Sequence, residues 1–227
     1  MSTIVVFGGT GYTGGNVIRE ATSRGHEVTS VSRSAPADPV QGVQYELGPV
    51  EELAPKVIPG ADAVIVALSP RGVLAGRLVK IDGDIAAQAA AVSARLVVIG
   101  GFSSLRPAPG APRIVGEMSG QFREEGEEND AVRVMLEDSA PEGLDWIYVS
   151  PASGYGAWAA GEHTGAYRIG GDVALFDSGG GSNISGADFA LAIVEEIEHP
   201  AHHRAHIGVA YLPERGDFTA SVSAGSQ

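Results

Sequence analysis

Short runs of β-branched and aromatic residues alternate along the chain with longer stretches in which apolar residues recur every three or four positions. Unbroken apolar runs are typical of strands buried on both faces of a parallel sheet, and the periodic stretches are typical of amphipathic helices. The predicted strands span residues 3–7, 27–32, 43–47, 62–68, 95–99, 145–149 and 207–211. The predicted helices span residues 15–23, 51–57, 77–94, 122–139 and 185–198, with an interruption at Gly126. Residues 167–176 are predicted to form a hairpin around Gly170 and Gly171.

This alternation of strand and helix predicts an α/β fold, a Rossmann-like doubly wound parallel sheet with helices on both faces. A chain of 227 residues suits one domain, which we assign to residues 1–212, with 213–227 as a flexible C-terminal tail. Two segments rich in Gly, Pro and Ser, residues 103–121 and 152–182, each follow the end of a predicted strand. Ligands of such sheets bind outside the carboxyl ends of the strands, so we expect these segments to form the walls of a substrate site.

The first predicted strand leads directly into a glycine-rich turn and then into the first helix. Residues 8–14 read GGTGYTG, which fits both G-x-G-x-x-G and G-x-x-G-x-x-G. Such a turn lets the backbone approach a pyrophosphate, and the helix that follows offers free N–H groups and its dipole to the phosphates. A turn of this kind can also occur in a domain that binds nothing, but its place between strand and helix favours a dinucleotide. The predicted contacts in the turn are Gly8, Thr10, Gly11, Tyr12, Thr13 and Gly14.

The end of the second predicted strand bears on which dinucleotide binds. An acidic residue about 20 positions past the glycines would hold the ribose 2′-hydroxyl of NAD. Here the strand ends in Ser32, Arg33 and Ser34, and the nearest acid, Glu27, lies at its start. A guanidinium flanked by hydroxyls suits the 2′-phosphate of NADP, so we expect NADP(H) and favour it over the alternative that Arg33 is an ordinary surface arginine. Further contacts are expected at the ends of later strands, at Ala67, Leu68, Gly100, Gly101 and Pro151.

Charge and composition narrow the classes of function. The chain has 28 acidic and 15 basic residues, a net charge of −13, which disfavours nucleic acid and anionic membranes as partners. It contains no cysteine, so it has no disulfide, no thiolate nucleophile and no Cys-based zinc site. No apolar run approaches the ~20 residues of a membrane span, and no leader-like segment precedes the first strand, so we expect a cytoplasmic protein. A monomer and a homodimer both remain open.

Two groups of titratable residues have the spacing of solvated surface rather than of a ligand site. Four histidines surround a break at Pro200, and we expect a solvated helix end there instead of a metal site. They are His199, His202, His203 and His206. The acidic run over residues 124–130 has no fixed ligand spacing and is expected to form a solvated helix face. We therefore expect no metal.

Longer stretches of the chain resemble a known family. GGTGYTG, SRS, VVIGGFSSL, DWIYVSPAS and the stretch GEHTGAYRIGGDVALFDSGGGSNISGADFALAIVEEIEHPAH resemble the NAD(P)H-binding, NmrA-like group of atypical short-chain dehydrogenase/reductases. That group includes relatives of biliverdin-IX-beta (flavin) reductase, and the resemblance implies a single Rossmann domain that binds NADPH. The chain departs from the group at two places. Such proteins often have Asp where this chain has Gly48-Pro49-Val50, which puts the adenine contact in doubt, and Arg where it has His163.

The catalytic pair of typical short-chain dehydrogenases is absent. That pair is Tyr-x-x-x-Lys, in which the lysine lowers the tyrosine pKa for proton transfer. The only lysines are Lys56 and Lys80, and the residues four positions earlier are Glu52 and Gly76. The absence disfavours an epimerase, a dehydratase or ordinary alcohol oxidation. It leaves NADPH-dependent hydride transfer to a small planar acceptor such as a flavin, quinone or tetrapyrrole, or a non-catalytic NADP(H)-binding redox sensor or scaffold of NmrA type.

Three side chains are candidates for acting on an acceptor. Ser104 follows the fifth predicted strand, where resembling proteins place a serine above the nicotinamide, although it can equally cap a loop. Tyr155 and His163 lie in the second wall, and a histidine can supply a proton near neutral pH, or simply be an exposed loop residue. Phe102 and Trp158 are candidates for stacking on a planar substrate, or are core or lid residues.

Overall fold

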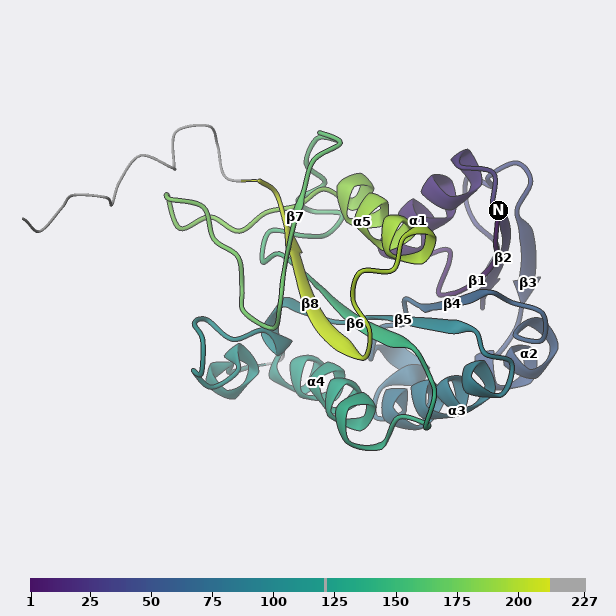
Figure 1. The fold of residues 1–227 in the computed structure, drawn as a ribbon, viewed down its shortest axis with the longest axis horizontal. Helices are drawn as coiled ribbons and strands as arrows, with labels where there is room; N and C mark the ends of the chain where they lie inside the picture. Colours follow the sequence, from purple (N-terminus) through teal and green to yellow (C-terminus); the bar gives the residue numbers. More distant parts are fainter. Residues whose placement is uncertain (121, 213–227) are drawn as a thin grey trace, which may run out of the picture.

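The computed structural model describes residues 1–120 and 122–212, so the predicted tail at 213–227 lies outside the described residues. Its centre is a sheet in the order β3-β2-β1-β4-β5-β6-β8-β7 (Figure 1). Every neighbouring pair is parallel except β7 and β8, which are antiparallel. The strands are β1 (Thr3–Phe7), β2 (Glu27–Ser32), β3 (Gln44–Leu47), β4 (Ala63–Val66), β5 (Arg95–Ile99), β6 (Trp146–Pro151), β7 (Arg168–Gly170) and β8 (Ala205–Ala210).

Helices cover both faces of the sheet, with α1 and α5 on one face and α2, α3 and α4 on the other (Figure 1). The α-helices are α1 (Tyr12–Ser23), α2 (Val50–Val57), α3 (Leu78–Ala91), α4 (Phe122–Ser139) and α5 (Gly186–Glu198). Three short 3₁₀ helices lie in the connections: η1 (Gly72–Leu74), η2 (Phe102–Ser104) and η3 (Ile114–Glu117). The predicted doubly wound α/β sheet is confirmed, with one antiparallel strand at its edge. None of the described helices is both long and apolar enough to cross a membrane.

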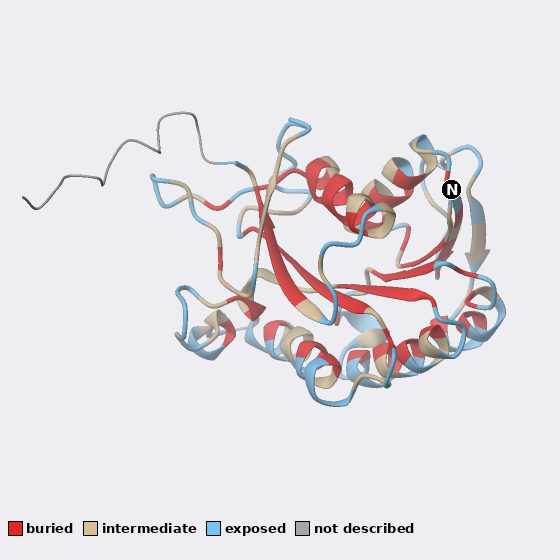
Figure 2. Cartoon of the chain, viewed as in Figure 1, coloured by how far each residue is buried: buried red, intermediate tan, exposed pale blue. Residues whose placement is uncertain are grey.

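The packing of strand β1 explains why its sequence is apolar at each of the four positions from Ile4 to Phe7. Ile4 and Val6 pack in the core beneath α1 and α5, whereas Val5 and Phe7 pack in the core beneath α2, α3 and α4. All four side chains are buried, and Figure 2 shows the central strands buried along most of their length. Because successive side chains of a strand point to opposite faces, a strand covered by helices on both sides needs an apolar residue at each position.

The topology brings the glycine turn to the point where the strand order reverses. From β1 the chain passes to β2 and β3 on one side and then crosses to β4 on the other side. The backbone N–H of Gly8 donates to the carbonyl of Val31 at 2.9 Å, and the N–H of Ala67 donates to the carbonyl of Phe7 at 2.8 Å. The ends of β2 and β4 therefore flank the turn, as expected of a ligand site at a topological switch point.

Two local predictions are wrong, and tertiary contacts explain both. Residues 167–176 do not form a hairpin with each other, because β7 pairs instead with β8, which lets Ile169 pack on the core beneath α5. Helix α4 runs through Gly126 without a break. A Cβ there would lie only 3.0 Å from the Met118 sulfur and 3.1 Å from the Ser103 hydroxyl, so the glycine lets the segment after β5 pack against the helix.

Candidate cofactor and acceptor site

The glycine turn depends on the absence of side chains at two of its positions. Gly8 has φ +84°, and a Cβ there would collide with the carbonyl of Ala67. A Cβ at Gly14 would collide with the carbonyl of Gly8. The N–H of Gly11 donates to the Gly8 carbonyl at 2.9 Å, which closes the turn immediately before α1 begins. The first N–H groups of α1 have no partners within the helix and give this end a partial positive charge, which suits phosphate.

A cavity of about 370 Å³ opens beside this turn, across the ends of β1, β2 and β4. Its volume lies within the range of small-molecule and cofactor sites, roughly 300–1,000 Å³. Seven of the predicted cofactor contacts line it, from three separate parts of the sequence. They are Gly8, Thr10, Gly11, Ser32, Arg33, Ala67 and Leu68. The structure therefore brings together the glycine turn, the end of β2 and the end of β4.

Other predicted contacts lie elsewhere. Tyr12 lines a second cavity of about 480 Å³, which shares Thr10 and Gly11 with the first and lies against α1. Ser34 is exposed next to Arg33 but does not line the first cavity. Outside both cavities are Thr13, Gly14, Gly100, Gly101 and Pro151. Packing explains why residue 100 is a glycine, because a Cβ there would collide with the buried Tyr148 ring.

Three arginines of the described chain line the first cavity, and only one of them has no acidic partner within that part of the chain. Arg71 forms an ion pair with Glu125 at 2.8 Å, and Arg77 forms one with Glu51. Arg33 is exposed and makes no ion pair with any residue in the described ranges. The neighbouring Ser32 hydroxyl accepts a hydrogen bond from the Thr10 N–H at 3.1 Å. An anion that enters the cavity can therefore bind the Arg33 guanidinium without first displacing an acidic side chain.

The sequence analysis missed two of these arginines, Arg71 and Arg77. Both follow β4 and lie on the same edge of the sheet as the glycine turn, so the rule that ligands bind at strand ends could have found them. Pro49 and Val50 also line the cavity, at the position where the resembling group often has Asp. This part of the cavity wall is apolar, and it suits the face of a flat base better than a polar edge.

Ser104 faces the interior of the protein. Its side chain is fully buried in η2, with its hydroxyl 3.3 Å from the Tyr148 hydroxyl. Its carbonyl accepts a hydrogen bond from Arg113 at 2.6 Å, and it lines neither of the two cavities at the glycine turn. The neighbouring Ser103 is half-buried and lies next to Gly101. The Ser104 hydroxyl is thus part of the packing beneath the end of β5, where a bound ligand would not reach it.

Tyr155 lies against the first turn of α1. Its hydroxyl is 2.7 Å from the Thr13 hydroxyl, and its ring packs edge-on against Tyr12 and tilted against Phe189. Burial raises the pKa of Tyr155 above its ordinary value, although the hydrogen bond with Thr13 opposes the shift. The phenol is therefore protonated at neutral pH, and it joins the second wall to the helix that follows the glycine turn.

His163 is exposed and is paired with a buried carboxylate. Its Nδ1 lies 2.9 Å from an oxygen of Asp188, whose own side chain is fully buried at the start of α5. Burial alone would raise the pKa of Asp188, but hydrogen bonds from the Thr164 N–H, the Ser185 hydroxyl and the Gly165 N–H lower it below its ordinary value. Asp188 is thus an anion that fixes residues 163–165, and it orients the imidazole of His163.

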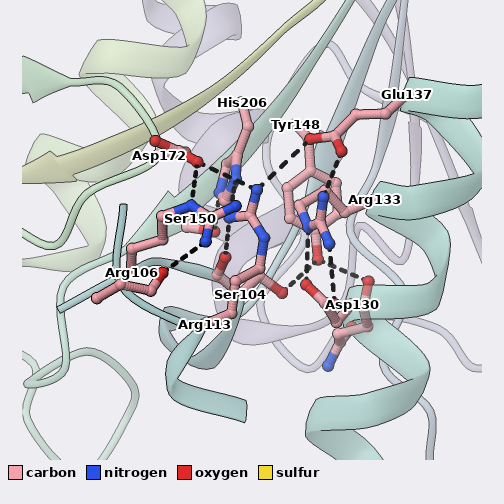
Figure 3. A network of polar contacts seen from close by, with 12 residues as sticks. Ser104, Arg106, Arg113, Asp130, Arg133, Glu137, Tyr148, Ser150, Asp172 and His206 are labelled. Atoms are coloured by element: carbon pink, nitrogen blue, oxygen red, sulfur yellow. Dashed lines mark hydrogen bonds and ion pairs between the residues drawn. The ribbon is translucent and has the colours of Figure 1, made fainter. Parts of the chain in front are cut away.

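The prediction of a solvated histidine cluster is wrong for His206. This residue lies buried on β8, with Nε2 at 2.9 Å from the Ser150 hydroxyl and Nδ1 at 3.3 Å from Arg113 (Figure 3). Burial, followed by the charges of Arg113 and Arg133, lowers the pKa of His206 to about 3. The ring is neutral at physiological pH, and because arginine only donates, Nδ1 accepts and Nε2–H donates to Ser150. Sequence spacing places these histidines near one another but does not reveal that β8 begins at residue 205.

Comparison with known proteins bears on what such a cavity binds. The sequence pattern of a family described as NAD(P)H-binding matches residues 8–200, which includes the glycine turn and both predicted walls. The chain belongs to this NAD(P)H-binding family. The glycine turn of this NAD(P)H-binding protein has the tight backbone and close strand–helix packing that a dinucleotide-binding turn requires, because backbone fills the places that side chains at Gly8 and Gly14 would occupy. The cavity beside the turn is where its residues would hold the cofactor.

Relatives of this NAD(P)H-binding protein cover nearly its whole length. The Bacillus subtilis protein YwnB is 32% identical over 214 residues, which is 88% of this chain and 93% of YwnB. A Streptococcus pneumoniae structure provisionally named an NADH-flavin reductase has a TM-score of 0.80 at 26% identity, covering 93% of this chain and 100% of that one. A Bacteroides thetaiotaomicron structure provisionally named an epimerase has a TM-score of 0.81 at 30% identity, covering 93% and 97%.

Proposed function

We propose that this protein is a single-domain, NADPH-dependent oxidoreductase that transfers a hydride to a small planar acceptor such as a flavin, quinone or tetrapyrrole-like pigment. The observation that carries the proposal is the cavity at the glycine turn, where Arg33 is the lining arginine without an acidic partner among the described residues. The provisional name of the Streptococcus pneumoniae neighbour, an NADH-flavin reductase, supports the flavin as one acceptor to test.

The preference for NADP over NAD rests on charge at the end of β2. An acid at this place would bind a 2′-hydroxyl and repel a 2′-phosphate. The end of β2 instead presents Arg33 next to Ser32, and the one acid that lines the cavity, Glu51, is already paired with Arg77. A guanidinium forms a strong charge-assisted hydrogen bond with a phosphate, and no other group of the cavity has to release it first.

A bound nicotinamide cofactor supplies the hydride in this chemistry, and the chain's own residues bind and orient the reactants. The backbone at Gly8 and Gly11 and the start of α1 would hold the phosphates, and Pro49 and Val50 would pack against the adenine. Of the side chains considered for acting on an acceptor, Ser104 lies inside the core and Tyr155 is hydrogen-bonded to Thr13. The third, His163, is exposed, and its Nδ1 is paired with Asp188. We therefore assign the proton to water, which suits flavins and quinones because they exchange protons with solvent.

A second function is a non-catalytic NADP(H)-binding redox sensor or scaffold. The observation in its favour is that the Tyr-x-x-x-Lys pair is absent and the Ser104 hydroxyl faces the core. In that case the cofactor would bind with NADPH preference, and no acceptor would turn over. The provisional epimerase name of the Bacteroides neighbour supports a third chemistry less well, because epimerisation needs the protein base that the absent pair would supply.

The test is a turnover assay on the purified full-length protein. NADPH or NADH is mixed with riboflavin, FMN, menadione or biliverdin, and oxidation is followed at the nicotinamide absorbance band. We expect acceptor-dependent oxidation with a kcat/KM at least about tenfold higher for NADPH than for NADH, the ratio that about 1.4 kcal/mol provides. Tight NADPH binding without turnover of any acceptor would support the sensor instead. Failure to bind either cofactor would contradict both functions.

The matched control is a variant of the glycine turn. Gly11→Val places a side chain where the backbone approaches the phosphates, and a Cβ at Gly11 would lie 3.2 Å from the Gly8 carbonyl. We expect cofactor binding to be lost while far-UV circular dichroism shows a folded chain. Retained binding in that variant would show that the dinucleotide binds elsewhere.

A further inference from the structure

Six side chains of alternating charge form a connected series of ion pairs near the end of the sheet where an acceptor would bind (Figure 3). In order they are Arg106, Asp172, Arg113, Glu137, Arg133 and Asp130, and successive partners lie 2.9, 3.1, 3.7, 2.5 and 2.7 Å apart. The arginines at 106 and 113 come from the segment after β5, which is the first predicted wall. Asp172 follows β7 in the second wall, and the other three residues lie on α4.

Asp172 is the acid that joins the two walls. One of its oxygens accepts from Nε of Arg106 at 2.9 Å and from Nη2 of Arg113 at 3.1 Å. Burial would raise the pKa of Asp172, but its hydrogen bond with Arg106 and the charges of both arginines lower it below its ordinary value. The backbone repeats the link, because the N–H of Arg106 donates to the Asp172 carbonyl and the N–H of Ala174 donates to the Arg106 carbonyl, both at 2.8 Å.

Among the described residues, no other acid pairs with both Arg106 and Arg113 and could replace Asp172. Arg106 has no other acidic partner among the described residues, and Arg113 has only Glu137, at 3.7 Å. The remaining contacts of Arg113 are neutral, namely the Ser104 carbonyl and the uncharged ring of His206. Without the carboxylate, Arg106 would lose its acidic partner and Arg113 would keep only the more distant Glu137, and a partly buried unpaired charge is unfavourable.

An aromatic pair crosses between the same two walls. Phe102 lies three residues after β5 and immediately before the first wall, and Phe176 lies in the second wall just past the residue that pairs with Arg106. Their ring centroids are 6.2 Å apart with the planes at 89°, an edge-to-face arrangement. Phe176 remains 41% exposed, so part of its ring is open to a ligand. Both rings lie at the carboxyl ends of the strands, where acceptors bind in such folds.

We propose that Asp172 is a positioning residue for the acceptor, and that Phe102 and Phe176 form the face against which a flat, uncharged ring system binds. This inference rests on the proposed function. Asp172 holds the two walls at the distance that keeps the rings in contact, and the ring faces provide apolar and stacking contact. The arginines beneath this face are paired with acids, so the site recognises the ring itself and not a phosphate or carboxylate attached to it.

The experiment measures acceptor binding separately from turnover. Quenching of riboflavin fluorescence gives its Kd for the full-length protein in the presence of NADP⁺, and the same quantity is measured for FMN. The variants are Asp172→Asn, Asp172→Glu, Phe176→Ala and the double variant Asp172→Asn/Phe176→Ala. Val92→Ala is the control, because Val92 is 38% exposed, like Phe176, and lies at the end of α3, away from the carboxyl ends of the strands.

We expect Asp172→Asn and Phe176→Ala each to weaken riboflavin binding about tenfold, the scale of a central contact residue, with NADPH affinity unchanged within about twofold. The double variant should be hardly weaker than either single variant, because the two residues act on one face, and such coupling would not arise from a general loss of stability. Asp172→Glu keeps the charge and should retain most of the affinity. FMN should bind wild type as riboflavin does, within about threefold, and Val92→Ala should bind as wild type.

Three results would overturn the inference: no riboflavin binding by wild type, affinities within twofold of wild type in both Asp172→Asn and Phe176→Ala, or a strong preference for FMN. If Asp172→Asn does not fold, Phe176→Ala and Asp172→Glu still decide the matter, because Phe176 is partly exposed and its truncation leaves the series of ion pairs intact. If riboflavin binds, the variants weaken it as expected and no acceptor turns over, the inference stands and the proposed oxidoreductase function fails.

Discussion

The hydroxyl of Thr13 and the hydroxyl of Tyr155 lie 2.7 Å apart and join the first turn of α1 to the wall that follows β6. The Tyr12 ring packs against the same tyrosine, and the Tyr12 hydroxyl accepts from the N–H of Gly186 at 3.1 Å. Helix α1, whose N-terminus would face the cofactor phosphates, is therefore hydrogen-bonded to both the second wall and the start of α5. Tyr155, which the sequence analysis offered as a candidate for acting on an acceptor, thus also links the glycine turn to the second wall.

The first prediction concerns this link. Tyr155→Phe removes one hydrogen bond, worth about 1 kcal/mol net, and should lower kcat by less than about fivefold. A general acid at this position would be worth about 10²–10⁴-fold instead. Steady-state turnover of menadione with saturating NADPH measures the difference. Thr13→Val is the partner variant, and the double variant should be no worse than either alone. A hundredfold loss in Tyr155→Phe would make this phenol the proton donor.

The second prediction concerns Ser104. Because its hydroxyl is buried against Tyr148 and not exposed to a ligand, Ser104→Ala should act on stability. We expect the free energy of unfolding to fall by about 1 kcal/mol, and turnover per folded molecule to stay within about threefold of wild type. Urea denaturation and active-fraction-corrected kinetics measure the two effects. A tenfold slower turnover in a fully folded variant would place the serine hydroxyl at the acceptor after all.

The third prediction concerns pH and His206. The pKa of this histidine falls from 6.5 to about 3 on folding, so below pH 6.5 the unfolded chain binds a proton that the folded chain does not. Its contribution to stability is therefore complete above pH 6.5 and declines as the pH falls towards 3, by up to about 1.4 kcal/mol per pH unit. His206→Gln should show a shallower decline between pH 6.5 and 4 in urea denaturation. Parallel pH profiles for wild type and variant would refute the assignment of a buried neutral imidazole.

Features that depend on contacts between residues close in sequence could be predicted from the sequence, whereas features that depend on tertiary contacts could not. The glycine turn was predictable because strand, turn and helix are adjacent in sequence, and Gly8 and Gly14 meet backbone only a few residues away or at a neighbouring strand end. The β7 pairing was not, because Gly170 and Gly171 resemble a hairpin turn locally, whereas burial of Ile169 against α5 decides the partner strand. Tertiary packing of this kind overrides local turn chemistry.

The same distinction between local and tertiary contacts applies to the residues of the candidate site. Arg33 could be identified from the end of β2 alone, because an acid or a base at that position is a local signal. The inward orientation of Ser104 could not, since it depends on Tyr148 of β6 and on Arg113, which the fold brings alongside from other segments. Asp172 carries no motif at all, and its role emerges only when the fold places it between two arginines of the other wall.

The central claim is that Arg33 binds the 2′-phosphate of NADP(H), and the most direct measurement compares the affinities of NADPH and NADH. Kd values come from nicotinamide fluorescence for wild type, Arg33→Asp and Lys56→Asp, which makes the same charge change on α2 away from the cavity. We expect wild type to prefer NADPH, and Arg33→Asp to lose about 1.5–3 kcal/mol of NADPH binding, roughly 10- to 150-fold, with NADH unchanged or tighter. Lys56→Asp should keep the wild-type preference. Equal affinity of wild type for the two cofactors, or an unchanged preference in Arg33→Asp, would contradict the claim.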